Sequence, residues 1–275
     1  MPELPEVETI ARTLRPALIG KTILSADLRW ARTLATPSPA AFKKQIKGQQ
    51  IESISRRAKF LDLQLSDYHL IIHLRMSGDL LVVLGGYQPA KHDRLIAQLS
   101  GDTSLIFSDP RKFGRVWLVE DSNETFRELG IEPLSDGFSA EWLYSALGNR
   151  RRQLKPLLLD QSFIAGLGNI YTDEALHLAK LHPLTISAEI TRKKVAGLWL
   201  AIREVLAEGI RRNGASIDWV YRGGDFQNHF RVYGRTGEPC PVCNTPIERI
   251  TVGQRGTHFC PHCQVRTKPK KTVKY

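Results

Sequence analysis

The chain begins Met1-Pro2-Glu3-Leu4-Pro5-Glu6, which places a proline beside a carboxylate at the amino terminus. If Met1 is removed, Pro2 presents a secondary α-amine. Its pKa of about 8 leaves part of the amine unprotonated and nucleophilic at neutral pH. Such an amine can attack an electrophilic carbon and form an iminium, as catalytic lysines do. The alternative is that Pro2 is an ordinary terminal residue with no chemical role.

The four cysteines follow the pattern Cys240-x2-Cys243-x16-Cys260-x2-Cys263. Two CxxC pairs at this separation are typical of a zinc site. Four thiolates complete a tetrahedron and leave no position for water, so this zinc would be structural. Clustered cysteines in an intracellular chain indicate a metal site more than disulfides. Reduced cysteines without metal are the alternative. His258 and His262 lie nearby, but the four cysteines suffice as ligands.

Several basic residues stand where they could meet phosphate. Gln254-Arg255-Gly256 is predicted to form the tip of a hairpin between the cysteine pairs, with Arg255 presented outward. Gly166-Leu167-Gly168-Asn169 precedes a predicted helix, and glycines allow a backbone to approach a ligand closely. Asn169 is a suitable N-cap, and helix starts bind anions through free N–H groups. Arg150, Arg151, Arg152 and Lys155 lie just upstream. A solvated surface is the alternative for these cations.

The first half of the chain holds a second group of candidates. Lys59 has the same parity as Leu61, Leu63 and Leu65, so it points inward or along a rim, where an anion must offset its burial. Met76 and Phe113 stand at predicted turns, the second beside Arg111. An exposed Met or Phe next to Arg on a turn would suit a wedge that enters a base stack. The alternative places Met76 and Phe113 in the core.

Hydrophobic periodicity predicts the elements that position these residues. Apolar residues at helical spacing indicate a helix over 5–18. Short apolar segments then predict an antiparallel sandwich or barrel: 22–28, 50–55, 60–65, 69–74, 80–84, 95–99, 105–107 and 116–119. A turn-rich stretch near 134–137 marks a domain boundary. Helices are predicted beyond it, over 140–147, 154–160, 170–180 and 188–212, followed by a loop over 214–230.

We therefore predict an α+β protein of several parts. Residues 1–135 form a β-sandwich with an N-terminal helix, and residues 136–230 form a helical domain with a loop. Residues 231–265 form a zinc hairpin, and residues 266–275 form a basic, disordered tail. No apolar run approaches the ~20 residues needed to span a bilayer. The N-terminus also lacks a signal-peptide core, so an intracellular, cytoplasmic protein is expected. The oligomeric state stays open, with a monomer as the default.

The charge distribution indicates a polyanionic partner. The net charge is +11, and residues 211–275 hold twelve Lys or Arg against four Asp or Glu. Such a surplus is typical of nucleic-acid binding. A membrane surface would also attract it, but no basic amphipathic helix with a lipid-facing stripe accompanies the charge. Nucleic acid is therefore the favoured partner.

Together these segments resemble the bacterial-type formamidopyrimidine-DNA glycosylases (8-oxoguanine DNA glycosylases) over almost the whole chain. The matching stretches are 1–8, 56–59, 73–78, 91–93, 109–114, 155–156, 166–171, 232–235 and the cysteine pattern. The family is implied to bind damaged double-stranded DNA through a helix-two-turn-helix domain and a zinc finger. It is implied to need one structural Zn²⁺ and no organic cofactor.

The resemblance implies a bifunctional glycosylase and AP lyase of base-excision repair. Pro2 would attack C1′ of the damaged nucleotide, and Glu3 would protonate the sugar oxygen as the base leaves. The resulting iminium acidifies the C2′ hydrogens and permits β- and then δ-elimination. Lys59 would donate a proton or bind phosphate, and Arg255 would bind phosphate and serve the δ step.

The resemblance also assigns binding residues. Met76, Arg111 and Phe113 would fill the gap left by the extruded base, since a base inside a duplex must be flipped out to be reached. The matched phosphate-contacting positions are His92, Arg150, Arg151, Lys155 and Asn169.

Two departures and two alternatives stay open. The loop over 214–233, which covers the lesion in relatives, is shorter than expected, and a basic tail follows Cys263. A sister enzyme that resembles endonuclease VIII removes oxidised pyrimidines and is expected to lack the Met/Arg/Phe trio. A zinc-bearing DNA-binding protein without catalysis would explain the charge and the cysteines, but not Pro2, Glu3 and Lys59.

Overall fold

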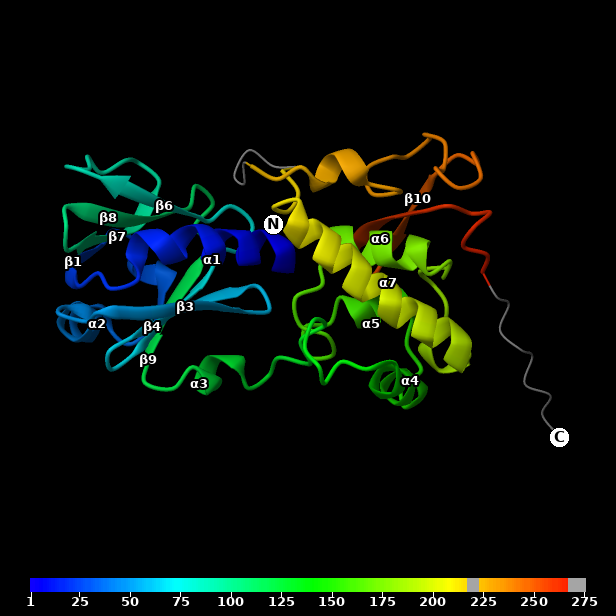
Figure 1. Ribbon diagram of the computed structural model, residues 1–275, viewed down its shortest axis with the longest axis horizontal. Coiled ribbons are helices and arrows are strands. Elements are labelled where there is room, and N and C mark those ends of the chain that lie inside the picture. Colours follow the sequence, from blue (N-terminus) through cyan, green and yellow to red (C-terminus); the bar gives the residue numbers. More distant parts are fainter. Residues whose placement is uncertain (217–222, 267–275) are drawn as a thin grey trace. The chain divides into compact units, whose positions relative to one another are not determined.

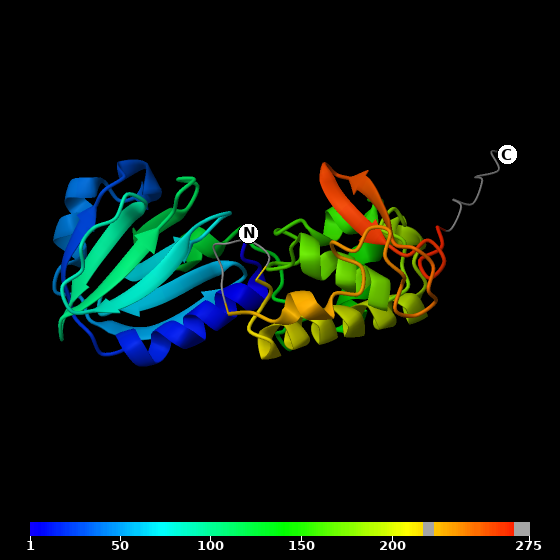
Figure 2. The ribbon, with the colours of Figure 1, turned by 90° about the horizontal axis from the view of Figure 1, so that it is seen from above.

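The computed structural model describes residues 1–216 and 223–266. These form two compact units (Figures 1 and 2). The first contains Met1–Leu129 and Gly209–Gln227, and the second contains Gly130–Glu208 and the chain from Asn228 onward. The 217–222 part of the predicted loop and the 267–275 part of the predicted tail lie outside the described residues.

The first unit is built on two sheets. One sheet has the order β1-β7-β8-β6 and the other the order β2-β9-β5-β4-β3. Their strands are β1 Ile23–Leu28, β2 Leu34–Thr36, β3 Ile51–Arg57, β4 Phe60–Leu65, β5 His69–His73, β6 Asp79–Leu84, β7 Asp93–Leu99, β8 Thr103–Ser108 and β9 Arg115–Val119. Inward side chains of both sheets share one apolar core, so the predicted sandwich is confirmed.

Two helices, α1 and α2, pack against this core. Helix α1, Leu4–Leu18, begins with a capping box and has Pro5 in its first turn, where a missing N–H costs nothing. Its buried stripe includes Val7, Ile10, Ala11, Leu14 and Leu18. Helix α2, Pro39–Ile46, buries Phe42 and Ile46, and α3, Asn123–Phe126, is a single turn.

The first unit differs from the sequence prediction in one strand pairing and in three additional elements. Strand β2 pairs with β9 in parallel, so the second sheet is not wholly antiparallel. Strand β2 and the helices α2 and α3 were not predicted. Strand β2 and helix α3 are too short to show a period. The two turns of α2 bury only Phe42 and Ile46, which is too few apolar positions to define one.

The second unit is helical with one hairpin. Its helices are α4 Ala140–Gly148, α5 Leu154–Leu158, α6 Asn169–Leu178 and α7 Arg192–Arg211, whose last residues belong to the first unit. Of the short 3-10 helices, η2 Ser187–Glu189 lies in this unit, η1 Ala31–Thr33 lies in the first unit, and η3 Phe226–His229 begins in the first unit and ends in the second. Strands β10 Glu248–Val252 and β11 Arg255–Phe259 form an antiparallel hairpin. Helix α6 lies between this hairpin and α7 (Figure 2).

Candidate functional site

The N-terminal residues are held rigidly at the start of α1. Pro2 is buried, and Glu3, the N-cap of α1, is 3% exposed. Glu6 accepts a hydrogen bond from the Glu3 backbone N–H at 2.7 Å through Oε2. Its other oxygen accepts from the Ala215 N–H at 2.7 Å. One buried carboxylate thus ties the predicted nucleophile and acid to the beginning of the loop after α7.

Close packing reinforces this contact. Gly214 has a φ of 80°, and a Cβ there would lie 2.6 Å from Glu6 Oε1. A side chain at this position is therefore excluded by both conformation and space. The sequence alone gives Gly214 no special role, because its contact residue, Glu6, is more than two hundred residues away.

Lys59 lies in the two-residue turn between β3 and β4 and is 5% exposed. His73 on β5 lies opposite Phe60, the residue after Lys59. Burial, with the nearby charges of Arg75 and Lys59, lowers the pKa of His73 to about 3. The neutral ring accepts a hydrogen bond from the Arg75 backbone N–H at 3.0 Å. It thereby fixes Arg75, whose φ is 55°, just before Met76.

The predicted wedge residues are on the surface. Met76 is 42% and Phe113 49% exposed, so the alternative that places them in the core is excluded. The Arg111 guanidinium lies over the Phe113 ring at 5.1 Å from its centroid. His92 is also exposed, and its carbonyl accepts a hydrogen bond from the Asp109 N–H at 2.9 Å. The Ser77 hydroxyl, next to Met76, donates a hydrogen bond to Asp109 Oδ1. The turns that carry Met76, His92, Arg111 and Phe113 are therefore neighbours.

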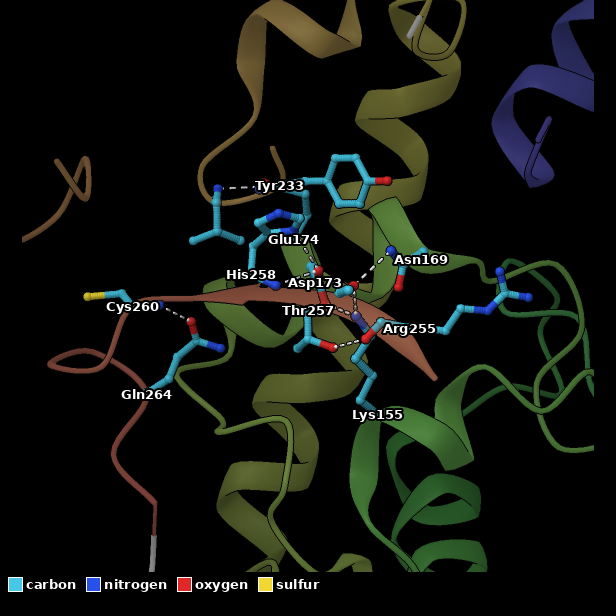
Figure 3. A network of polar contacts seen from close by, with 12 residues as sticks. Lys155, Asn169, Asp173, Glu174, Tyr233, Arg255, Thr257, His258, Cys260 and Gln264 are labelled. Carbon is cyan, nitrogen blue, oxygen red and sulfur yellow. Dashed lines mark hydrogen bonds and ion pairs between the residues drawn. The ribbon is translucent and has the colours of Figure 1, made fainter. Parts of the chain in front are cut away.

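A buried ion pair in the second unit connects two helices with the hairpin (Figure 3). Lys155 Nζ is 2.6 Å from Asp173 Oδ1, and both side chains are inaccessible to solvent. Lys155 also donates to the Gly256 carbonyl at 3.1 Å. The other oxygen of Asp173 accepts from the His258 N–H at 2.9 Å. The pair joins α5 and α6 to β11.

This burial changes the interpretation of Lys155. The sequence suggested a phosphate contact, but the ammonium group is enclosed and neutralised by Asp173. A lysine in this state has no exposed charge to offer a phosphate. We therefore treat Lys155 as part of the hairpin's support.

Asn169 and Arg255 lie at the edge of the same network. Helix α6 begins at Asn169, and its N-cap is Gly168, so the prediction of Asn169 as N-cap is wrong by one residue. The Asn169 amide instead donates to the Gly256 carbonyl at 3.0 Å. Arg255 is exposed and extends away from the network (Figure 3).

The hairpin turn is one position earlier than predicted. Gly253 and Gln254, with φ of 55° and 62°, form the turn, and Arg255 pairs with Val252. Two successive left-handed residues are typical of the tight turns that match strand twist. Arg255 is thus the first residue of β11.

Sequence reasoning missed the two acids on α6. Glu174 accepts hydrogen bonds from the backbone N–H groups of Arg231, Val232 and Tyr233 at 2.8, 3.0 and 2.8 Å. Burial raises the pKa of Glu174 against these bonds. Asp173 and Glu174 therefore hold two different segments of the chain. The available signal was two adjacent acids in a buried helix, since buried carboxylates need partners.

The basic run before α5 is a surface feature. Arg151 pairs with Glu189 at 3.4 Å, and Arg152 pairs with Asp160 at 2.8 Å. The Arg150 guanidinium lies 4.9 Å from the centroid of the Phe163 ring. Arg150 and Arg151 are exposed despite these contacts.

The four cysteines form a metal centre. Their Sγ atoms all lie within 4.8 Å of one another, and neighbouring pairs are 3.5–4.0 Å apart. A tetrahedral zinc with Zn–S bonds of about 2.3 Å needs sulfur atoms roughly 3.8 Å apart. His177 Nε2 lies 3.4 Å from Cys240 Sγ, as an outer partner that orients a thiolate ligand. The residues present fit zinc.

Comparison with known proteins gives three matches along the chain. Residues 1–116 match the formamidopyrimidine-DNA glycosylase N-terminal domain, and residues 129–220 match its H2TH domain. Residues 237–265 match a zinc finger found in FPG and IleRS. A formamidopyrimidine-DNA glycosylase of Chloroflexus aurantiacus is 50% identical over 273 residues, which cover 96% of this chain and 98% of the relative. The chain belongs to the formamidopyrimidine-DNA glycosylase family.

Solved structures of this family agree. A structure of MutM with DNA containing carbocyclic 8-oxo-G has a TM-score of 0.91 and 38% identity. A complex of Lactococcus lactis Fpg with DNA containing an abasic site has a TM-score of 0.91 and 37% identity. Each match covers 96% of this chain and 100% of the other. The four-cysteine cluster is thus the site of one structural zinc ion.

Among the described residues, no helix has the length and apolar character needed to cross a bilayer.

Proposed function

We propose that this protein is a bifunctional DNA glycosylase and AP lyase that removes 8-oxoguanine and formamidopyrimidines from duplex DNA. The observation that carries the proposal is the N-terminal pair Pro2 and Glu3, held by the capping box of α1 in a chain of this family. The lesions are those of solved relatives, whose DNA contained 8-oxo-G or FAPY-dG. We further propose that the protein works in the cytoplasm, as a monomer on nucleoid DNA.

The proposed reaction begins after removal of Met1. The Pro2 nitrogen attacks C1′ of the lesion nucleotide as Glu3 gives a proton to the sugar ring oxygen, and the base leaves with the glycosidic electrons. The ring-opened sugar is then joined to Pro2 as an iminium. The positive nitrogen acidifies the C2′ hydrogens. Loss of one of these protons expels the 3′ phosphate, and a second elimination expels the 5′ phosphate.

Two cations support the eliminations. Lys59, nearly buried at the turn before β4, is proposed to donate a proton or hold a phosphate during β-elimination. Arg255, exposed at the start of β11, is proposed to bind phosphate and assist the δ step. Each expelled phosphate leaves as an anion that a nearby cation stabilises.

The remaining site residues are proposed to reshape the duplex. Met76, Arg111 and Phe113 replace the extruded nucleotide in the stack, and His92 and Asn169 hold phosphates. Arg150 and Arg151 add positive charge along the approach of the DNA. Such contacts offset the cost of unstacking a base.

Single-turnover assays on three duplexes test the proposal: 8-oxoguanine opposite cytosine, thymine glycol opposite adenine, and undamaged DNA. We expect fast cleavage of the first duplex, with phosphates at both ends of the gap. Preferential cleavage of the thymine glycol duplex would favour the oxidised-pyrimidine enzyme. Tight binding of damaged DNA without any cleavage would identify a non-catalytic binder.

A further inference from the structure

A single buried carboxylate lies between the two turns that carry the wedge residues. Asp109 is 1% exposed. It begins the 109–114 turn, which carries Arg111 and Phe113. The Ser77 hydroxyl donates a hydrogen bond to Asp109 Oδ1. Ser77 is 3% exposed and directly follows Met76 in the 74–78 turn. The carboxylate is therefore bonded to the residue next to one wedge side chain.

The same carboxylate also holds the other turn. Its Oδ1 accepts from the Arg111 backbone N–H at 3.2 Å, and its Oδ2 accepts from the Gly114 N–H at 2.7 Å. The Ser77 oxygen itself accepts from the Arg111 N–H at 3.3 Å. Phe113 thus lies between two residues whose backbone is bonded to the carboxylate. An ionised carboxylate only accepts, and it has about four acceptor positions, which suits three donors.

The ring of Phe107 packs closely against a glycine in each of the two turns. A Cβ on Gly78 would lie 2.8 Å from Phe107, and a Cβ on Gly114 would lie 2.3 Å from the same ring. Both turns therefore approach Phe107 more closely than any other residue type would allow. Their spacing is set by packing against Phe107 and by hydrogen bonds to Asp109.

We propose that Asp109 is the positioning residue that fixes the 74–78 and 109–114 turns to each other, so that Met76, Arg111 and Phe113 enter the duplex as one unit. This inference rests on the proposed function, because it assumes that these side chains replace an extruded nucleotide. Because Asp109 is buried, we assign it no direct contact with the DNA. It acts through the backbone of Arg111 and Gly114 and through Ser77.

The substitution Asp109→Asn tests the carboxylate with almost no change of shape. Its amide NH₂ must face either the Gly114 N–H or the Ser77 and Arg111 donors, so at least one donor loses its acceptor. Asp102→Asn is the matched control, because Asp102 is an exposed carboxylate at the turn between β7 and β8 of the same unit. Both variants are assayed as full-length, zinc-loaded protein.

Two measurements distinguish a loss of positioning from a general loss of protein function. Extrusion is followed by the fluorescence of 2-aminopurine next to 8-oxoguanine, and cleavage is measured on that duplex and on one with a preformed abasic site. We expect Asp109→Asn to slow extrusion and excision by about tenfold. Abasic-site cleavage should fall much less, because a missing base removes most of the unstacking cost. A double-mutant cycle supplies the decisive comparison. In a Met76→Ala/Phe113→Ala background, Asp109→Asn should have little further effect.

The results distinguish failure of the proposed function from failure of the positioning role. If the wild-type protein does not cleave the 8-oxoguanine duplex, the proposed function fails. If the wild type cleaves it but Asp109→Asn extrudes and excises like Asp102→Asn, the positioning role is overturned. Equal slowing on both lesions, or a full effect in the double-alanine background, would also overturn it.

Discussion

At the scale of single residues, the proposed chemistry depends on groups whose orientation is fixed by hydrogen bonds. Glu3 caps α1 and is itself held by Glu6. His73 is kept neutral and fixes the backbone of Arg75. A reacting group that is already oriented loses little entropy on reaching the transition state.

The role of Glu3 gives a sharp prediction. Glu3→Gln keeps the size of the side chain but cannot donate the acid proton. Excision of 8-oxoguanine should fall by about 10²–10⁴-fold, while cleavage of a preformed abasic site, which needs no departing base, should persist. Single-turnover kinetics on the two duplexes measure this. Glu8→Gln on the same helix is the control, and equal losses on both duplexes would contradict the assignment.

His73 predicts a pH dependence of stability. Its pKa is 6.5 when unfolded and about 3 in the folded protein, so between these values the unfolded chain binds the extra proton. Stability therefore rises with pH in this window, and it falls as the pH drops below 6.5, by at most about 1.4 kcal/mol per unit from this group.

Urea unfolding at a series of pH values tests this dependence. His73→Gln should lose stability less steeply below pH 6.5 than the wild type. The exposed His229→Gln serves as control and should follow the wild-type curve. Parallel curves for wild type and His73→Gln would refute the prediction.

At the scale of elements, α6 organises the second unit through two successive acids. Asp173 holds β11, and Glu174 holds the 231–233 segment. The Lys155–Asp173 pair is buried, so removing one partner leaves an uncompensated charge. The hairpin that carries Arg255 is the element that would lose its support.

Asp173→Asn should therefore be costly. We expect a loss of roughly 3–5 kcal/mol in the free energy of unfolding, together with weaker DNA binding. Urea denaturation and DNA titrations measure both quantities. Glu141→Gln removes the exposed Arg192–Glu141 pair at 3.9 Å and should cost less than about 1 kcal/mol. If the two variants unfold at the same urea concentration, the buried pair does not have this role.

The same scale shows how far the sequence could predict the structure. Each of the eight segments predicted as strands overlaps an observed strand, and the four predicted helices of the second half are present. Apolar residues at strand or helix spacing mark these segments in the sequence. The domain boundaries predicted between residues 135 and 136 and between residues 230 and 231 stay predictions. The return of residues 209–227 to the first unit could not be predicted, because it depends on the distant contact of Glu6 with Ala215.

The candidate site also contains residues that the sequence could predict and residues that it could not. Spacing alone revealed the cysteine centre, whose ligands are close in sequence. Lys155 was misread because its partner, Asp173, is eighteen residues away and sequence gives no sign of their contact. Asp109 was passed over because its partners are mainly backbone N–H groups, which every residue possesses.

At the scale of the whole molecule, DNA binding should depend on zinc. Cys243→Ala removes one ligand of the four-cysteine centre, so the metal should be lost and the hairpin should come apart. We expect less than stoichiometric zinc by atomic absorption and an affinity for lesion duplex reduced by about tenfold or more. Val242→Ala, an exposed neighbour, should keep both. Full affinity in a zinc-free preparation would refute this dependence.

The central claim is that a proline nitrogen joins covalently to the sugar of a damaged nucleotide. Borohydride reduction during cleavage of the 8-oxoguanine duplex, followed by digestion and mass spectrometry, tests it most directly. We predict a stable adduct that maps to Pro2 in protein lacking Met1. Fully active protein that retains Met1, or an adduct that maps to Lys59 or to another amine, would contradict the account.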